Sequence, residues 1–313
     1  MEWAMQLYSF HTKGELVEGL DWKGRNAKLP YSKRDAKVIV PIVKLGASKT
    51  YAPWECISAS AIMIKVSDLL TGTKLCPKPI LKAIKRAGGI HAFLGFYGEI
   101  IISPIMEDGK LLRFSYRTYA KIINALKVDA YLTLDAPTYH GRAPYSEYKL
   151  RQIRRGNRFL LKKCRHVRAI GLVKGSDLSQ IDAIVCEMLG LGIVAFAFHT
   201  GDFLSRGSKA ELFEAKEFIR SVRQKVSILM IYGVGSHRHL IDFYSEADVF
   251  ITQSHFAYKM DSREKIMQRL VKIAADLERL EKHPRLIRWM PNCEEAIKWE
   301  SQNREMTRNL LKA

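Results

Sequence analysis

Short apolar, β-branched segments alternate with amphipathic segments along most of this 313-residue chain. Apolar strands joined by helices are typical of a parallel sheet, because helices then bury both faces of each strand. The predicted strands are Lys37–Val43, Ser58–Lys65, Glu99–Ser103, Asp129–Asp135, Val167–Val173, Gly192–Phe198, Ser227–Tyr232 and Asp248–Thr252. Eight strands of this kind predict an α/β protein built as a closed (β/α)8 TIM barrel, with an open doubly wound sheet as the alternative.

The segments between these strands carry apolar residues at helical spacing, as at Ile181, Ile184 and Met188. The predicted helices are Pro79–Arg86, Tyr116–Leu126, Ser146–Lys163, Ser179–Leu189, Lys209–Arg223, Ser236–Ser245, Ser262–Leu280 and Cys293–Leu311. We find neither an internal repeat nor a low-complexity linker. The chain is therefore expected to form a basic N-terminal segment at 1–35, one barrel at 36–260 and a C-terminal helical extension at 261–313.

The charge of the chain is strongly positive, with 51 Lys and Arg against 32 Asp and Glu, a net charge of +19. Such an excess favours a polyanionic partner, because neutralising phosphates releases counterions; a merely basic surface is the alternative. Between Arg142 and Arg168 the cations are densest, and Glu147 is the single acid. From this stretch we predict six nucleic-acid-binding residues: Arg151, Arg154, Arg155, Arg158, Lys162 and Lys163.

Five scattered cysteines without Cys-x-x-Cys spacing suggest neither a disulfide framework nor a zinc site. The longest apolar runs are too short to span a bilayer, and the N-terminus lacks a secretion-signal pattern. We therefore expect a reduced cytoplasmic protein with no metal, no other cofactor and no membrane association.

In a barrel of this type, functional residues follow the carboxyl ends of the strands. The candidates for catalysis are Asp135, His199 and Asp202, and the candidates for binding a substrate or base are Ser103, Lys174, Phe196, Phe198, Gly233 and Gly235. Structural alternatives stay open for several of them. Asp135 could bond a loop amide or pair with Lys174, His199 and Asp202 could form a loop turn, and Phe196 could pack in the core. His91 is expected to be structural.

Several short motifs stand in order along the strand ends: Gly88-Gly89-Ile90-His91-Ala92-Phe93, Leu134-Asp135, Gly171-Leu172-Val173-Lys174-Gly175, Gly201-Asp202, Gly233-Val234-Gly235, Ala247-Asp248-Val249-Phe250 and Ser254-His255-Phe256-Ala257-Tyr258. Together, over about residues 85–260, they resemble the tRNA-guanine transglycosylase superfamily. That family exchanges a guanine for a 7-deazaguanine in tRNA, as in queuosine and archaeosine formation, and its relatives do so in DNA. The resemblance implies a barrel that handles a base of a nucleic acid.

The chain departs from the family where the chemistry is done. The resemblance places Ser103 at the acid/base aspartate and Ile251 at the nucleophilic aspartate, and the zinc motif has no counterpart. Base exchange through a covalent sugar intermediate needs a carboxylate beside the anomeric carbon. We therefore expect a nucleic-acid-binding protein, for tRNA ahead of DNA, that has lost the exchange reaction and pairs with a catalytic paralogue or with itself.

Two enzymatic alternatives remain open. The first is an active pentosyltransferase, or a base or nucleoside hydrolase, that uses relocated acids at Asp135, Asp202 and Asp108. The second is a barrel enzyme acting on a small phosphorylated substrate, since a shared fold does not determine function. If a base enters the barrel it must leave its stack, and we expect Phe196, Phe198 and Tyr139 to sandwich it.

Overall fold

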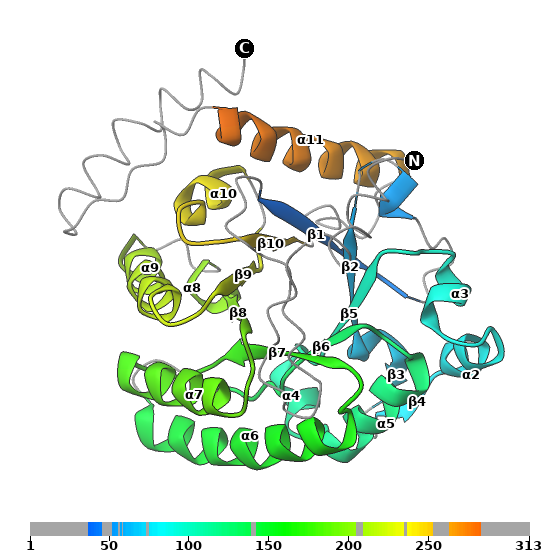
Figure 1. The fold of residues 1–313 in the computed structure, drawn as a ribbon, viewed down its shortest axis with the longest axis horizontal. Helices are drawn as coiled ribbons and strands as arrows, with labels where there is room; N and C mark the ends of the chain where they lie inside the picture. Colours follow the sequence, from blue (N-terminus) through cyan, green and yellow to red (C-terminus); the bar gives the residue numbers. More distant parts are fainter. Residues whose placement is uncertain are drawn as a thin grey trace.

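The computed structural model describes residues 37–45, 52–55, 57, 59–72, 75–138, 142–204, 209–234, 237–252 and 263–282. Eight parallel strands close into a barrel in the order β1-β10-β9-β8-β7-β6-β5-β2, as Figure 1 shows. They are β1 (Val38–Val43), β2 (Ala61–Lys65), β5 (Glu99–Ser103), β6 (Ala130–Leu132), β7 (Arg168–Val173), β8 (Ala195–His199), β9 (Ile228–Tyr232) and β10 (Val249–Thr252). Because β1 pairs with β10 as well as β2, the sheet is closed, and the prediction of a (β/α)8 barrel is confirmed.

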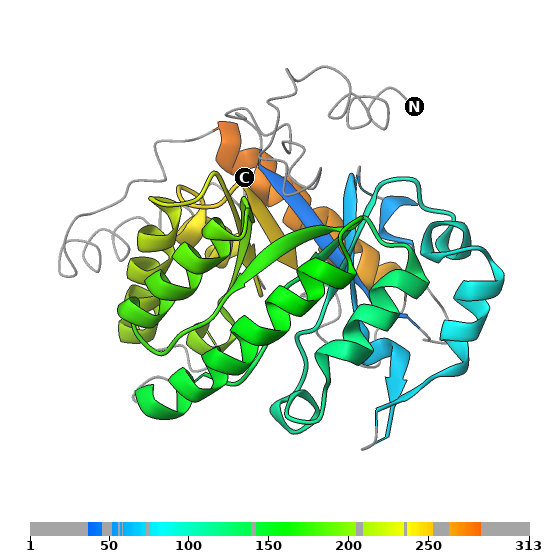
Figure 2. The ribbon, with the colours of Figure 1, turned by 60° about the horizontal axis from the view of Figure 1, so that its bottom comes forward.

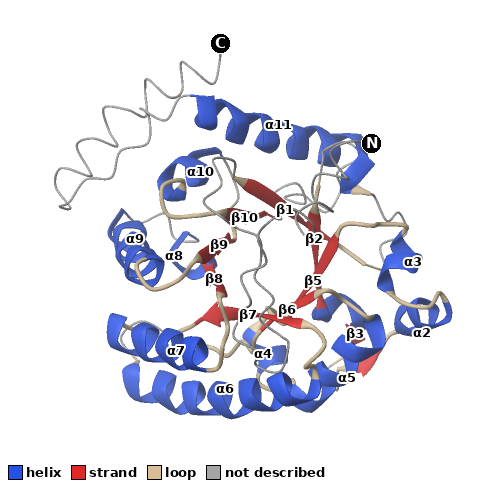
Figure 3. Ribbon diagram, viewed as in Figure 1, coloured by secondary structure: helices blue, strands red, loops and turns tan. Residues whose placement is uncertain are grey.

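Helices surround the barrel (Figure 3). They are α2 (Pro79–Arg86), α3 (Ile90–Leu94), α4 (Asp108–Leu111), α5 (Tyr116–Leu126), α6 (Ala143–Lys163), α7 (Leu178–Gly190), α8 (Gly201–Leu204), α9 (Lys209–Arg223), α10 (His237–Phe243) and α11 (Arg263–Lys282). After β2 come the 3-10 helix η2 (Val66–Leu69) and an antiparallel pair, β3 (Leu70–Thr71) and β4 (Cys76–Pro77); a further 3-10 helix, η1 (Pro53–Glu55), precedes β2. None of the described helices is long and apolar enough to cross a membrane.

The short helices are where the expectations from the sequence were wrong. The structure contains three short helices, α3, α4 and α8, that were not predicted. Helices of four or five residues are shorter than the window in which helical periodicity can be recognised. The predicted terminal segment 1–35 and the predicted helix Cys293–Leu311 lie outside the described residues.

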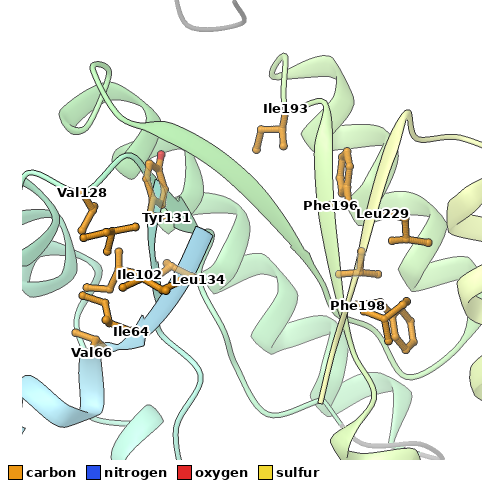
Figure 4. Packing of buried hydrophobic residues seen from close by; sticks show 14 of the residues in the cluster. Ile64, Val66, Ile102, Val128, Tyr131, Leu134, Ile193, Phe196, Phe198 and Leu229 are labelled. Atoms are coloured by element: carbon orange, nitrogen blue, oxygen red, sulfur yellow. The ribbon is translucent and has the colours of Figure 1, made fainter. Parts of the chain in front are cut away.

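Alternating strand residues divide the apolar core into two layers. In β9, Ile228, Met230 and Tyr232 face the lumen, whereas Leu229 and Ile231 pack against the helices. Figure 4 shows part of the helix-facing layer. Because successive strand side chains point to opposite faces, the parity of a residue in its strand decides which layer it joins.

A tight glycine turn leads from α2 into α3. Gly88 and Gly89 have φ values of +92° and +141°, a region that L side chains rarely adopt. Just beyond the turn, His91 Nδ1 lies 2.9 Å from the Phe96 carbonyl oxygen and Nε2 lies 2.9 Å from Asp129 Oδ2. His91 therefore joins α3 to the start of the strands, which confirms the structural role expected for it.

Candidate functional site

The carboxyl ends of the strands bring polar side chains together at one end of the lumen. Every second strand residue faces the lumen, and the last such residues are Lys65 in β2, Ser103 in β5, His199 in β8 and Tyr232 in β9. Lys174 lies just after β7, two residues beyond the lumen-facing Leu172. Strand pairing places Lys65 beside Ser103 and His199 beside Tyr232. We call these five residues, together with Asp68 and Asp135, the mouth cluster.

An ion pair lies within the mouth cluster. Lys174 Nζ is 3.0 Å from Asp135 Oδ1, and the two side chains are only 9% and 5% exposed. The chain before Asp135 is held by Asn157 of α6, whose buried Oδ1 accepts a hydrogen bond of 3.0 Å from the Leu134 amide. The alternative that pairs Asp135 with Lys174 is confirmed. A buried ion pair adds little net stability, because desolvating both charges offsets their attraction. Its position in the barrel mouth makes the pair a candidate for contacting a ligand.

His199 is a neutral imidazole at physiological pH. Burial lowers its pKa to about 3, with further lowering from the nearby positive charges of Lys174 and Lys65. Its ring meets the Tyr232 ring edge-on at 4.9 Å between centroids. A Cβ on Gly201 would lie 2.9 Å from the ring, so only glycine leaves room for the imidazole there. A neutral histidine can accept one hydrogen bond and donate another, but it does not supply a positive charge.

The pKa of His199 makes the fold sensitive to acid. Below pH 6.5 the unfolded chain gains a proton on this histidine, whereas the folded protein does not until about pH 3, so stability falls as the pH is lowered. Between pH 7 and pH 5 the wild type should lose roughly 2 kcal/mol more unfolding free energy than His199→Gln. Urea denaturation at several pH values measures this difference; parallel losses in the two proteins would contradict it.

Three members of the mouth cluster were missed by sequence reasoning. Burial raises the pKa of Tyr232 above its usual range, the Ser103 hydroxyl opposes that shift, and the Asp135 and Asp68 carboxylates add to it. Burial also lowers the pKa of Lys65, against the attraction of Asp68. The pKa of Asp68 is raised by its own burial, although its carboxylate accepts a hydrogen bond of 3.1 Å from the Leu45 amide and lies near three lysines.

Strand parity explains two of these residues once the structure shows which face of each strand turns toward the lumen. Lys65 and Tyr232 end their strands in the same parity as Met63 and Met230, which face the lumen. Asp68 lies beyond the strand in η2, where no parity argument applies. The Tyr232 hydroxyl stays protonated and can donate a hydrogen bond in the mouth.

The positions where the resemblance places the family's two aspartates hold no carboxylate. The Ser103 side chain is buried, and its Oγ accepts a hydrogen bond of 3.2 Å from the Ile105 amide. Ile251 is buried among the lumen residues. The nearest acid in that strand segment, Asp248, lies at the opposite end of β10, where it pairs with Arg223 at 2.6 and 3.1 Å. The mouth therefore offers mainly hydrogen-bond donors, with Asp135 and Asp68 as the described carboxylates of the cluster.

The expected aromatic sandwich does not form from β8. Phe196 and Phe198 lie in the helix-facing layer, as Figure 4 shows, whereas Ala195 and Ala197 face the lumen. The parity of β8 turns both phenyl rings away from the mouth. The core-packing alternative for Phe196 is thus the correct one. The third residue of the expected sandwich, Tyr139, lies outside the described residues.

The remaining predicted site residues are only partly described. Gly233 follows β9 with φ +101°, and its amide donates a hydrogen bond of 3.1 Å to the Ile251 carbonyl. A Cβ there would lie 3.1 Å from Thr200 Oγ1, which favours glycine in this turn. Asp202 lies in α8, but its side chain is not among those described, and Gly235 is outside the described residues.

The basic residues of α6 fall into two groups. Arg154 bonds Glu147 at 3.2 Å and Glu187 of α7 at 2.8 Å, Arg158 bonds Glu187 at 2.9 Å, and Arg151 lies 3.4 Å from Glu147. Arg151, Arg154 and Arg158 therefore form ion pairs on α6 and across to α7, and the side chains of Arg151 and Arg158 stay 74% and 65% exposed. The side chains of Arg155, Lys162 and Lys163 are exposed.

Comparison of the sequence with protein-family models and with curated proteins finds no match. Within the described ranges, no group of three or more His, Cys, Asp or Glu side chains is placed to hold a metal ion.

Proposed function

We propose that this chain is a transglycosylase-like nucleic-acid-binding protein whose barrel mouth receives an unstacked base, with tRNA as the preferred partner, and which does not itself exchange that base. The supporting observation is the pair of buried residues Ser103 and Ile251 at the positions where the resemblance places the two aspartates. Neither a hydroxyl bonded to a backbone amide nor a hydrocarbon side chain can replace a carboxylate beside an anomeric carbon.

The mouth cluster carries the groups that recognise a base edge. Proteins that flip a base from its stack bind it through hydrogen bonds to its polar edge. Lys174 and the protonated Tyr232 hydroxyl are donors, and Asp135 is an acceptor a few ångströms from Lys174. A guanine-type edge, which presents carbonyl and ring-nitrogen acceptors beside amino and imino donors, matches this combination. On this proposal any exchange chemistry comes from a second subunit, a catalytic paralogue or another copy of the chain.

The second candidate is an enzyme that uses a relocated acid. It is favoured by the position of Asp135, which lies in the same cluster as His199 and Tyr232. In such an enzyme Asp135 would act at the sugar, and the Tyr232 hydroxyl would donate a hydrogen bond to the leaving base. Lys174 Nζ, 3.0 Å from Asp135 Oδ1, would balance the negative charge of a carboxylate in this role.

One experiment separates the two candidates. Purified wild type and Asp135→Asn are incubated with labelled guanine and tRNA, and in parallel with duplex DNA, while fluorescence anisotropy follows binding over a range of salt. We expect binding with a slope that shows several released counterions, and no incorporation of label by either protein. Incorporation by the wild type that Asp135→Asn abolishes would establish the enzyme instead. Absence of salt-dependent binding would contradict both and favour a small phosphorylated substrate.

A further inference from the structure

Exposed cations gather at the end of the barrel opposite the mouth. They stand where α2, α5 and α6 end, before the chain re-enters the barrel at the amino ends of the strands. We call them the rim cations: Lys85, Arg86, Lys127, Lys162, Lys163 and Arg165, all of them exposed. Lys162, Lys163 and Arg165 belong to the basic stretch between Arg142 and Arg168, whereas Lys85, Arg86 and Lys127 come from other segments, so the surface is complete only in the folded chain.

Contacts between neighbouring elements join the three helix ends into one surface. A Cβ on Gly89, just after α2, would lie 3.5 Å from both Cβ and Cδ of Lys127 at the end of α5. Asn124 of α5 donates a hydrogen bond of 3.4 Å to the Lys163 carbonyl at the end of α6. In Figures 1 and 2 the helices α2, α5 and α6 lie side by side, in agreement with these contacts. The rim cations are therefore neighbours in space.

The surface is almost free of acidic residues. The segments 78–95, 116–128 and 148–168, which supply the rim cations, contain no Asp or Glu. Two carboxylates lie nearby at the strand starts, and each is engaged: Glu99 pairs with Arg168, and Asp129 bonds His91 and the Ile100 amide. The seam between α6 and α7 is different, because Glu187 neutralises the arginines there.

We propose that the rim cations bind the phosphate backbone of a duplex arm of the same RNA whose base enters the mouth, an inference that rests on the proposed function. Clustered cations with no acid between them complement a line of phosphates. A folded RNA carries unpaired nucleotides and duplex arms in one molecule, and its duplexes are bound mainly through backbone and shape. Because α6 has 21 residues, the mouth and the rim are about 30 Å apart, which a duplex of about ten base pairs spans.

The test neutralises four rim cations together. The variant carries Lys85→Gln, Lys127→Asn, Lys162→Gln and Lys163→Gln; asparagine is chosen at Lys127 because its φ is +57°, which asparagine tolerates. A matched control removes the same charge elsewhere, with Lys225→Gln, Lys265→Gln, Lys272→Gln and Lys282→Gln. We expect the rim variant to bind tRNA about 100-fold more weakly at 0.15 M salt, with a salt slope smaller by about three to four. The control should stay within about threefold of the wild type.

A second experiment compares the affinities of two RNA hairpins that share one loop and have stems of 5 or 15 base pairs. It tests whether binding depends on a duplex long enough to extend from the mouth to the rim. The wild type should prefer the long stem, and the rim variant should bind both stems alike, with its short-stem affinity unchanged. That unchanged affinity also shows that the variant is folded. Equal losses in the rim and control variants, or a rim variant that binds tRNA like the wild type, would overturn the inference and leave the proposed function standing. A wild type that binds none of these RNAs would overturn both.

Discussion

Replacing Lys174 with methionine is expected to lower the free energy of unfolding by about 3 to 5 kcal/mol. The substitution keeps most of the side-chain volume but removes the cation 3.0 Å from Asp135, which is only 5% exposed. The carboxylate would then be buried without its partner, and in a folded protein that charge costs far more than it does in water. Urea denaturation at pH 7 measures the change.

A double-mutant cycle separates the missing charge from lost packing. In Asp135→Leu with Lys174→Met, neither charge remains in the mouth, so we expect the double variant to recover most of the stability lost by Lys174→Met. Additive losses would instead show that Lys174 contributes through packing alone. The same double variant should bind tRNA more weakly than wild type, because two of the three groups proposed to contact the base, Lys174 and Asp135, are both gone.

Replacing Phe196 with alanine should lower the free energy of unfolding by about 4 kcal/mol while leaving the tRNA affinity of the folded protein unchanged. The Phe196 side chain is fully buried. Its ring packs so closely over β7 that a Cβ on Gly171 would lie 2.7 Å from it. Loss of the ring leaves a cavity between the barrel and α7, far from any base in the mouth. Denaturation and anisotropy on the same preparation measure the two quantities.

The conservative variant Phe196→Leu is the control for this result. Leucine fills part of the space, so we expect a loss of roughly 1 to 2 kcal/mol and again no change in affinity. If Phe196→Ala kept its stability but lost tRNA binding, the ring would have to contact the base. That outcome would contradict the helix-facing placement of Phe196.

Local patterns in the sequence were enough to predict the barrel. Runs such as Glu99–Ser103 and helices such as Tyr116–Leu126 have the same bounds in the structure as in the prediction. The candidate site was predicted less completely. Asp135, Lys174 and His199 do meet in the mouth, but Lys65, Asp68 and Tyr232 were missed and Phe196 was misplaced. An apolar run shows that a segment is a buried strand, but by itself it does not show which face turns toward the lumen.

The sequence by itself determined the strands, the main helices, the positive charge and the absence of aspartates at Ser103 and Ile251, because these depend on residue type and local spacing. Only the tertiary structure decided which charges are neutralised. Arg154 and Arg158 meet Glu187, which is about 30 residues away in the chain. The segments 116–128 and 148–168, which contain Lys127 and Lys163, hold no Asp or Glu. Closing the barrel brings distant segments into contact, and charge pairing depends on distance in space rather than on order in the chain.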